Sequence, residues 1–310
     1  MCMLQSRYII SKDKYIFNSC SFLQFSGFVT RWKMTAFICY FISCFSNNNK
    51  KECRTNFHNI PLPSECHTVL TEADIGNRPV FVIGDVHGCL EELCELLDAV
   101  NKIEPSTMYV FVGDLVNRGP DSVGVVRKLR EMAPGSVYAV RGNHDESALR
   151  EALLYREDNN YALSDKYHWI KQLTDADFQY LSDLPYTVEI PCLSSMIVHA
   201  GIIPGRPLRL QVLNDLTNMR NIVDKEDPIY GGGLVATNKH GEGVPWITLW
   251  PGPTHVYFGH DARRKLQKGA HATGLDTGCC HGGELTGVFI GSDGTREFIS
   301  VKSRQPNIYD

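Results

Sequence analysis

Apolar runs and helical repeats alternate along the chain from Ile75 onward. The segment 80–83 is an uninterrupted apolar run followed by glycine, which is typical of a buried strand. Apolar residues then recur at helical spacing over 90–100, with glutamates on the opposite face. Further apolar runs at 108–112 and 137–140 each lead into another helical pattern. Strands that alternate with helices in this way predict an α/β fold.

The second half of the chain is richer in strand patterns. Residues 160–184 have a helical pattern, and strands are expected at 187–190, 196–198, 255–258, 287–290 and 297–301. The stretch 205–250 is rich in loop-forming residues and shows no sustained period. The overall pattern therefore predicts a mixed protein of the α/β (α+β) class.

Glycine and a chemically active side chain follow each of the first three predicted strands. These endings are Gly84-Asp85-Val86-His87-Gly88, Gly113-Asp114 and Gly142-Asn143-His144-Asp145. Later strands end in His199-Ala200-Gly201 and Gly259-His260. In α/β folds, ligands bind at the carboxyl ends of strands. Carboxylates and imidazoles gathered there are typical ligands of transition metals.

Composition narrows the possible environments. The chain has 310 residues, of which 43% are hydrophobic and 21% charged, as expected for a globular protein. The net charge of −4 gives no overall attraction to DNA or to an anionic membrane. The 11 cysteines include no C-x-x-C pair, which favours reduced thiols in a cytoplasmic protein.

In the first 74 residues, aromatic residues and cysteines are scattered without helical or strand periodicity. These residues form a predicted extension that is poorly ordered or used for targeting. A catalytic domain is predicted at 75–310. Within it, the apolar run at 35–46 is shorter than the roughly 20 residues that a spanning helix needs. It has the length of a signal-peptide core. A secretory or membrane-tethered protein is therefore the alternative to a cytoplasmic one, and no firm membrane association is expected.

The strand-end motifs, in this order, resemble those of the PPP-type calcineurin-like metallophosphoesterases. The closer similarity is to the ApaH-like phosphatases, relatives of the bacterial symmetrical diadenosine tetraphosphatase. Three marks support this branch: Asn117, Pro120, and Asp145 in place of the glutamate usual in protein Ser/Thr phosphatases. Two further marks are the runs 259–264 and 274–279.

The resemblance implies a central two-sheet mixed β-sandwich flanked by helices, with a two-metal site at its rim. Six metal ligands are implied: Asp85, His87, Asp114, Asn143, His199 and His260. It further implies that His144 is the general acid, that Asp145 beside it and Arg118 are also catalytic, and that Arg118 binds phosphate. Arg220 is a second candidate for binding phosphate, and the basic run containing Arg263 and Arg264 is a candidate for binding further phosphates.

Phosphate hydrolysis gives these residues definite tasks. Two divalent ions can hold the attacking hydroxide and neutralise phosphate charge. Mixed nitrogen and oxygen ligands suit Mn, Fe or Zn better than Mg or Ca. The planar fork of Arg118 matches two phosphate oxygens, and the imidazole of His144 can protonate the leaving group. Because Asn117 stands where protein phosphatases usually have aspartate, we expect His144 to be less basic here.

The leading hypothesis is a metal-dependent phosphohydrolase that cleaves phosphoanhydride bonds. Its substrates would be phosphorylated small molecules such as dinucleoside polyphosphates, inorganic polyphosphate, or capped RNA. The alternative is a protein Ser/Thr phosphatase acting on phosphoproteins, against which Asn117 and the form of the third motif argue. A catalytically inactive binding protein is disfavoured because all six ligand positions are filled. A nucleic-acid-binding protein with structural metals is disfavoured by the net charge.

Overall fold

The computed structural model describes residues 55–56, 58–158, 160–225 and 233–307. These residues belong to one compact unit, Cys53–Asp310. Most of the predicted N-terminal extension, residues 1–54 with the apolar run at 35–46, lies outside the described residues. In the part of the chain that is described, no helix combines the length and apolarity needed to cross a bilayer.

One sheet has five strands in the order β14-β13-β2-β3-β4. Its strands are β2 (Val80–Ile83), β3 (Met108–Phe111), β4 (Val137–Ala139), β13 (Glu284–Ile290) and β14 (Arg296–Lys302). Strands β2, β3 and β4 are parallel to one another, whereas β13 is antiparallel to both β2 and β14. Ile83 pairs with Phe111, which pairs with Ala139, so the three parallel strands end at the same level. Residues that follow them therefore meet at one edge of the sheet.

The second sheet has six strands in the order β1-β5-β6-β10-β12-β11. They are β1 (His67–Val69), β5 (Thr187–Ile190), β6 (Ser195–Val198), β10 (His255–Phe258), β12 (Ala272–Gly274) and β11 (Gln267–Lys268). Strands β6, β10 and β12 run parallel to one another. Their carboxyl ends define a second common edge, which supplies the remaining site residues.

The two sheets stack face to face over an apolar core. Val80 and Val82 of β2 share this core with Val188 of β5 and Ile197 of β6. The alternate residues of β2, including Phe81, belong to a different core beneath the helices. Because successive side chains of a strand point to opposite faces, β2 is buried on both sides, as its continuous apolar run predicts. The predicted two-sheet sandwich flanked by helices is confirmed.

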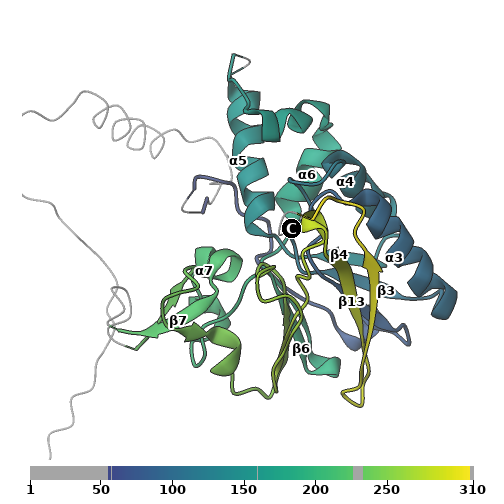
Figure 1. Cartoon of the computed structure of the whole chain (residues 1–310), viewed down its shortest axis with the longest axis vertical. Coiled ribbons are helices and arrows are strands. Elements are labelled where there is room, and N and C mark those ends of the chain that lie inside the picture. Colours follow the sequence, from purple (N-terminus) through teal and green to yellow (C-terminus); the bar gives the residue numbers. More distant parts are fainter. Residues whose placement is uncertain (1–54, 57, 159, 226–232, 308–310) are drawn as a thin grey trace, which may run out of the picture. The chain divides into compact units, whose positions relative to one another are not determined.

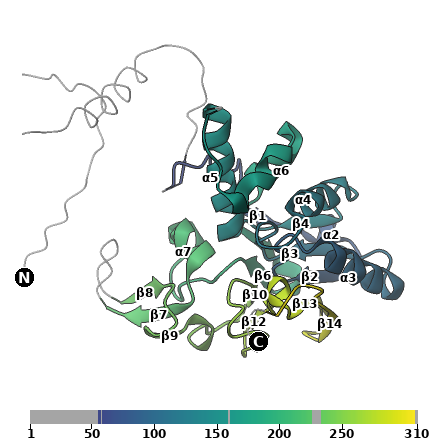
Figure 2. The ribbon, with the colours of Figure 1, turned by 45° about the horizontal axis from the view of Figure 1, so that its top comes forward.

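Helices cover the outer face of the five-stranded sheet. They are α3 (Leu90–Ile103), α4 (Ser122–Glu131), α5 (Asn143–Glu157), the 3₁₀ helix Asp165–Gln172, and α6 (Asp175–Asp183). Figures 1 and 2 show α3 and α4 side by side next to this sheet, with α5 and α6 forming a neighbouring pair. Asp121 and Thr174 accept N–H groups at the starts of α4 and α6, which satisfies otherwise unpaired donors. The predicted helical stretch 160–184 thus consists of two short helices.

The stretch 205–250 contains structure that the sequence did not predict. It includes α7 (Leu213–Asn218) and a sheet of β7 (Asn221–Asp224), β8 (Leu234–Thr237) and β9 (Val244–Pro245). Trp246, only 1% exposed, packs with Ile222 against Val256 and Phe258 of the six-stranded sheet. This packing fixes the loop that carries Arg220 at the rim of the sandwich.

Residues before 75 also contribute to the fold. Strand β1 pairs in parallel with β5, and α2 (Glu72–Ile75) begins at Thr71, whose hydroxyl accepts the N–H of Asp74. The sequence analysis assigned this stretch to the N-terminal extension, because a strand of three residues is too short to show a period. The described part of the catalytic unit therefore begins before residue 75. Further 3₁₀ helices span Pro191–Leu193, Leu208–Leu210, Trp246–Thr248 and Cys279–His281.

Candidate active site

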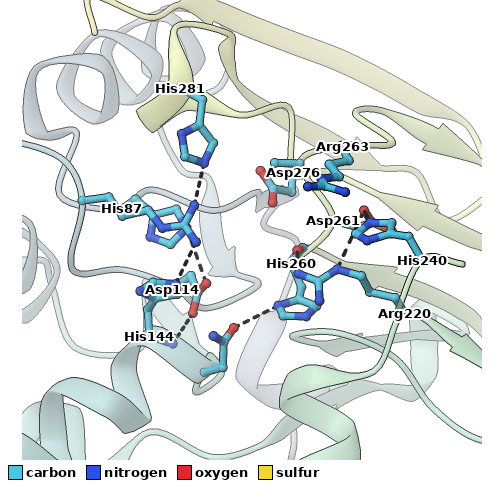
Figure 3. Close-up of a pocket in the computed structure, with 13 residues that line it drawn as sticks. His87, Asp114, His144, Arg220, His240, His260, Asp261, Arg263, Asp276 and His281 are labelled. Atoms are coloured by element: carbon cyan, nitrogen blue, oxygen red, sulfur yellow. Dashed lines mark hydrogen bonds and ion pairs between the residues drawn. The ribbon is translucent and has the colours of Figure 1, made fainter. Parts of the chain in front are cut away.

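The strand-end motifs converge where the carboxyl ends of the two sheets meet. Asp85 and His87 follow β2, Asp114 follows β3, and Asn143 begins α5 just after β4. From the other sheet, His199 follows β6 and His260 follows β10. The structure therefore brings together all six residues that the sequence singled out as metal ligands. Figure 3 shows several of them around one cavity.

Asp114 lies at the centre of this cluster. Its carboxylate oxygens are each 3.4 Å from an imidazole nitrogen, Oδ2 from Nε2 of His87 and Oδ1 from Nε2 of His199. Oδ1 also accepts the backbone N–H of His144 at 2.8 Å. Asp114 is 2% exposed, and it takes part in two groups of buried or half-buried donor atoms, one with His87 and His144 and one with His199 and His260.

The side-chain oxygen of Asn143 faces two other imidazoles. Its Oδ1 lies 3.1 Å from Nε2 of His199 and 2.9 Å from Nδ1 of His260. Asp85 sits behind His260, whose backbone N–H it accepts at 3.0 Å. Asp85 is thus attached to the cluster from beneath, between the two sheets.

Three of these imidazoles are oriented by backbone carbonyls. Nδ1 of His87 lies 3.1 Å from the carbonyl of Val116, and Nδ1 of His199 lies 2.8 Å from that of Val112. Nε2 of His260 lies 3.0 Å from the carbonyl of Asn218. A carbonyl can only accept, so each of these nitrogens carries the hydrogen. In a neutral ring the other nitrogen then carries a lone pair.

Those lone pairs face oxygen atoms of Asp114 and Asn143. Burial lowers the pKa of His87 to about 3, despite the nearby carboxylate of Asp114. Burial, together with neighbouring His199, also lowers the pKa of His260 well below its ordinary range. Both rings are therefore neutral at pH 7. The lone pair of an unprotonated nitrogen repels the lone pairs of a nearby oxygen unless a cation lies between the two atoms. This set of donor atoms therefore fits divalent metal ions.

Buried carboxylates add negative charge to the same region. Burial, and then the proximity of Asp276 and Asp114, raises the pKa of Asp85. Burial raises the pKa of Asp276 to about 6. Carboxylates crowded in this way favour bound cations over an empty site.

The backbone at the site is strained. His87, Asp114 and His260 have φ angles of 49°, 49° and 68°, and Asn117 and Arg118 have φ of 71° and 69°. Residues other than glycine rarely adopt this left-handed region, because it costs each of them about 1–3 kcal/mol. The sharp turns after the strands are thus maintained by the surrounding packing, and they direct the ligand side chains inward.

Arg118 bridges two further histidines at the mouth of the site. Its Nη2 donates to Nε2 of His144 at 3.0 Å, and its Nη1 donates to Nε2 of His281 at 2.5 Å. Burial lowers the pKa of His144, in the direction expected from sequence, although Asn117 is not the cause. A guanidinium has five N–H donors, so Arg118 keeps donors for a phosphate beside these two contacts.

Asn117 is itself held by Trp169, a residue to which the sequence analysis gave no role in the site. The indole N–H of Trp169 donates to Oδ1 of Asn117 at 3.1 Å. The amide nitrogen of Asn117 consequently faces His144 and donates to its backbone carbonyl at 2.9 Å. An indole can only donate, so this contact fixes the orientation of the amide.

A second arginine reaches the site from the 205–250 region. Arg220 donates to the backbone carbonyls of Asn238 and His260, both at 3.2 Å. Its Nε is buried and has no hydrogen-bond partner among the described residues. Burial lowers the pKa of Arg220, although Asp261 nearby raises it. A guanidinium that is half-buried and incompletely paired is suited to binding an anion.

The remaining residues that the sequence predicted for the site are Asp145, Arg263 and Arg264, and they differ in how close they lie to the cavity. Asp145 is fully buried behind the site, where its carboxylate accepts the N–H groups of Leu115 and Gly142. Burial raises its pKa to about 8. Arg264 is bound to Asp261 at 2.5 Å and to Asn221 at 2.8 Å, whereas exposed Arg263 lines the cavity.

The cavity has a volume of about 160 Å³. Among the described residues it is lined by His87, Asp114, Arg118, Asn143, His144, Arg220, His240, His260, Asp261, Ala262, Arg263, Asp276 and His281. The sequence analysis gave no role to His240, whose Nε2 lies 2.8 Å from Oδ1 of Asp261. No local pattern distinguishes His240 from a surface histidine, because long-range packing alone brings it to the site.

The fold and the donor set define a metal-dependent hydrolase. The sequence signature of the calcineurin-like phosphoesterase family matches residues 78–274, and the chain belongs to this family. The family membership inferred from the motifs is thereby confirmed.

The similar proteins include one named as a protein phosphatase and others named as dinucleoside tetraphosphatases. The chain is 32% identical over 218 residues to "Serine/threonine-protein phosphatase 1" of Salmonella typhimurium, covering 67% of this chain and 90% of the relative. It is 29% identical over 244 residues to the asymmetrical bis(5'-nucleosyl)-tetraphosphatase PrpE of Halalkalibacterium halodurans, covering 73% and 94%. A crystal structure described as a candidate diadenosine tetraphosphatase superposes with a TM-score of 0.65 at 36% identity, covering 77% of this chain and 98% of that one.

Proposed function

We propose that this protein hydrolyses a phosphoanhydride bond of dinucleoside polyphosphates at a centre of two divalent metal ions. The observation that carries the proposal is the orientation of three imidazoles. His87, His199 and His260 each donate an N–H to a backbone carbonyl and turn the other nitrogen toward Asp114 or Asn143. A structural histidine has no reason to aim a lone pair at an oxygen.

The residues around the cavity can be divided between two ions. Asp85, His87 and Asp114 would hold the first, and Asp114, Asn143, His199 and His260 would hold the second. When bound, such ions supply a nucleophile at neutral pH and neutralise charge on the phosphate oxygens. The mixed nitrogen and oxygen donors favour Mn, Fe or Zn.

The protein's own cations would bind the phosphate. Arg118 lies at the mouth of the cavity, and Arg220 enters from the opposite side, with its Nε 4.0 Å from a carboxylate oxygen of Asp261. Each guanidinium can donate two parallel hydrogen bonds to phosphate oxygens.

His144 is placed to protonate the leaving oxygen. Its Nε2 lies in the cavity beside Arg118, and its ring meets that of His87 edge-on at 4.8 Å between centroids. Asp145 and Asn117 act on it indirectly. Asp145 ties the start of α5 to the loop after β3, and Asn117 holds the backbone carbonyl of His144.

Two relatives named as tetraphosphatases support an anhydride substrate, whereas the relative named as a Ser/Thr phosphatase supports a phosphoprotein. Asn117 favours the first, because the amide nitrogen turned toward His144 cannot stabilise a charged imidazole as a carboxylate would. Inorganic polyphosphate and capped RNA carry the same bond and are further candidates.

The state of the cysteines supports a cytoplasmic location. Free thiols are found at Cys89, Cys94, Cys192, Cys279 and Cys280.

A competition assay tests the proposal. The full chain, loaded with manganese, is offered diadenosine tetraphosphate, tripolyphosphate, capped RNA and a phosphopeptide together, and the products are identified by mass. We expect diadenosine tetraphosphate to be consumed first. An Asp114→Asn variant controls for contaminating phosphatases. Preferential consumption of the phosphopeptide would replace the proposal with the Ser/Thr phosphatase function.

A further inference from the structure

A second cavity opens beside the catalytic one. Its volume is about 650 Å³, four times that of the catalytic cavity. Ala262, Arg263 and His281 line both cavities, so the two adjoin at these residues. A volume of this size is in the range of pockets that bind small molecules, roughly 300–1,000 Å³.

Gly278 lies in the wall of the second cavity, close to two residues that line both cavities. A Cβ atom built on Gly278 would lie 3.9 Å from the Cβ atoms of both Ala262 and His281. Gly278 has a φ of 75°, a conformation that residues other than glycine rarely adopt. Its N–H donates to Asp276, which lines the catalytic cavity. The backbone at Gly278 is thus fixed close to the catalytic cavity and carries no side chain.

The walls of the second cavity combine two kinds of surface. Gly278, Gly282 and Gly283 present backbone, and Ala262 and Thr277 present small side chains, so this part of the lining holds no bulky side chain. Arg263 and Lys265 are exposed and belong to the same lining, and neither forms an ion pair with a carboxylate among the described residues. A lining without bulky side chains leaves room for a planar base, and unpaired cations suit phosphates.

We propose that the second cavity binds one nucleoside of the substrate, with Arg263 and Lys265 on the phosphates that connect it to the scissile bond. The inference rests on the proposed function and specifies it further. A bare polyphosphate would leave the part of the cavity lined by small residues without a partner, so the cavity favours dinucleoside polyphosphates over inorganic polyphosphate.

The chain offers a matched pair of variants for a test. Lys265→Glu reverses a charge at the rim of the second cavity. Lys268→Glu makes the same change three residues away, where Lys268 lies over the ring of Phe298 at 4.1 Å and lines neither cavity. Ala262→Phe places a bulky ring where the two cavities adjoin. Melting temperatures of all three are measured first, so that a loss of folding is recognised.

The measurement is the ratio of kcat/KM for diadenosine tetraphosphate to kcat/KM for p-nitrophenyl phosphate, a small monoester that needs only the catalytic cavity. We expect this ratio to fall about tenfold in Lys265→Glu and at least as far in Ala262→Phe, with the ratio of Lys268→Glu equal to that of wild type.

The outcomes separate the two proposals. If the wild-type chain hydrolyses diadenosine tetraphosphate while all three variants keep the wild-type ratio, the role of the second cavity is overturned and the proposed function stands. If the wild-type chain prefers the phosphopeptide, the proposed function fails and the inference fails with it.

Discussion

Gly259 provides a sharp test of how the six-stranded sheet holds the site. It lies directly before His260, and a Cβ atom added there would lie 1.8 Å from Oδ1 of Asp85 and 2.7 Å from Cγ2 of Val112. Asp85 is 3% exposed, so its carboxylate has no room to withdraw. The variant Gly259→Ala must therefore push Asp85 away from the N–H of His260, which it accepts at 3.0 Å.

The size of the effect follows from two contributions. Overpacking a buried site costs about 1–3 kcal/mol, and loss of a hydrogen bond to a charged group costs about 1.5–3 kcal/mol. The free energy of unfolding should therefore fall by about 2.5–6 kcal/mol, which lowers Tm by roughly 5–24 °C in a domain of this size. Because Asp85 is an expected ligand, the manganese concentration for half-maximal activity should rise about 10- to 100-fold.

Thermal unfolding and a manganese titration of activity measure both effects. Gly241→Ala is the matched control, since its added Cβ meets nothing within 4 Å. If Gly259→Ala had the Tm and the manganese dependence of this control, the close approach of the two sheets at Asp85 would be wrong, and so would its role in holding metal.

Three further perturbations probe other parts of the molecule. Arg220→Lys should lower kcat/KM by about 10- to 100-fold, because lysine cannot reproduce the fork of a guanidinium; an effect below threefold would argue against phosphate binding by Arg220. Dialysis against EDTA should abolish activity and lower Tm, and added Mn²⁺ should restore both; full activity in the chelated protein would refute the metal centre. Burial lowers the pKa of His255 to about 4, below the 6.5 of an unfolded chain, so below pH 6.5 the unfolded chain binds a proton that the folded one does not. Stability should therefore fall between pH 6.5 and 4, and less steeply in His255→Gln; parallel Tm–pH curves for the two proteins would contradict this explanation.

The comparison of Asp114 with His240 shows what kind of information the sequence contains. Asp114 follows an apolar strand and a glycine, so its position at the carboxyl end of a parallel strand can be predicted from its neighbours. His240 lies in a region without a period, and it reaches the cavity only because β7, β8 and β9 pack beside the six-stranded sheet. Sequence spacing carries no record of such packing.

Trp169 and Asp145 make the same point for residues that support the site. Trp169 is the kind of residue expected in a core, yet its indole N–H sets the orientation of Asn117. Asp145 belongs to a motif and was therefore expected to be catalytic, whereas it is buried and bound to backbone N–H groups of Leu115 and Gly142. A motif identifies a residue that the site needs without saying whether it touches the substrate.

The sequence by itself determined the strand–helix alternation, the family and the set of residues expected to bind metal, because each depends on local patterns and on motifs whose order is visible along the chain. The tertiary structure decided which arginines reach the cavity, how the three imidazoles are turned, and that a second cavity adjoins the first at Ala262, Arg263 and His281. Those features arise where segments far apart in the chain meet. Their contacts depend on the packing of whole sheets, which no short stretch of sequence specifies.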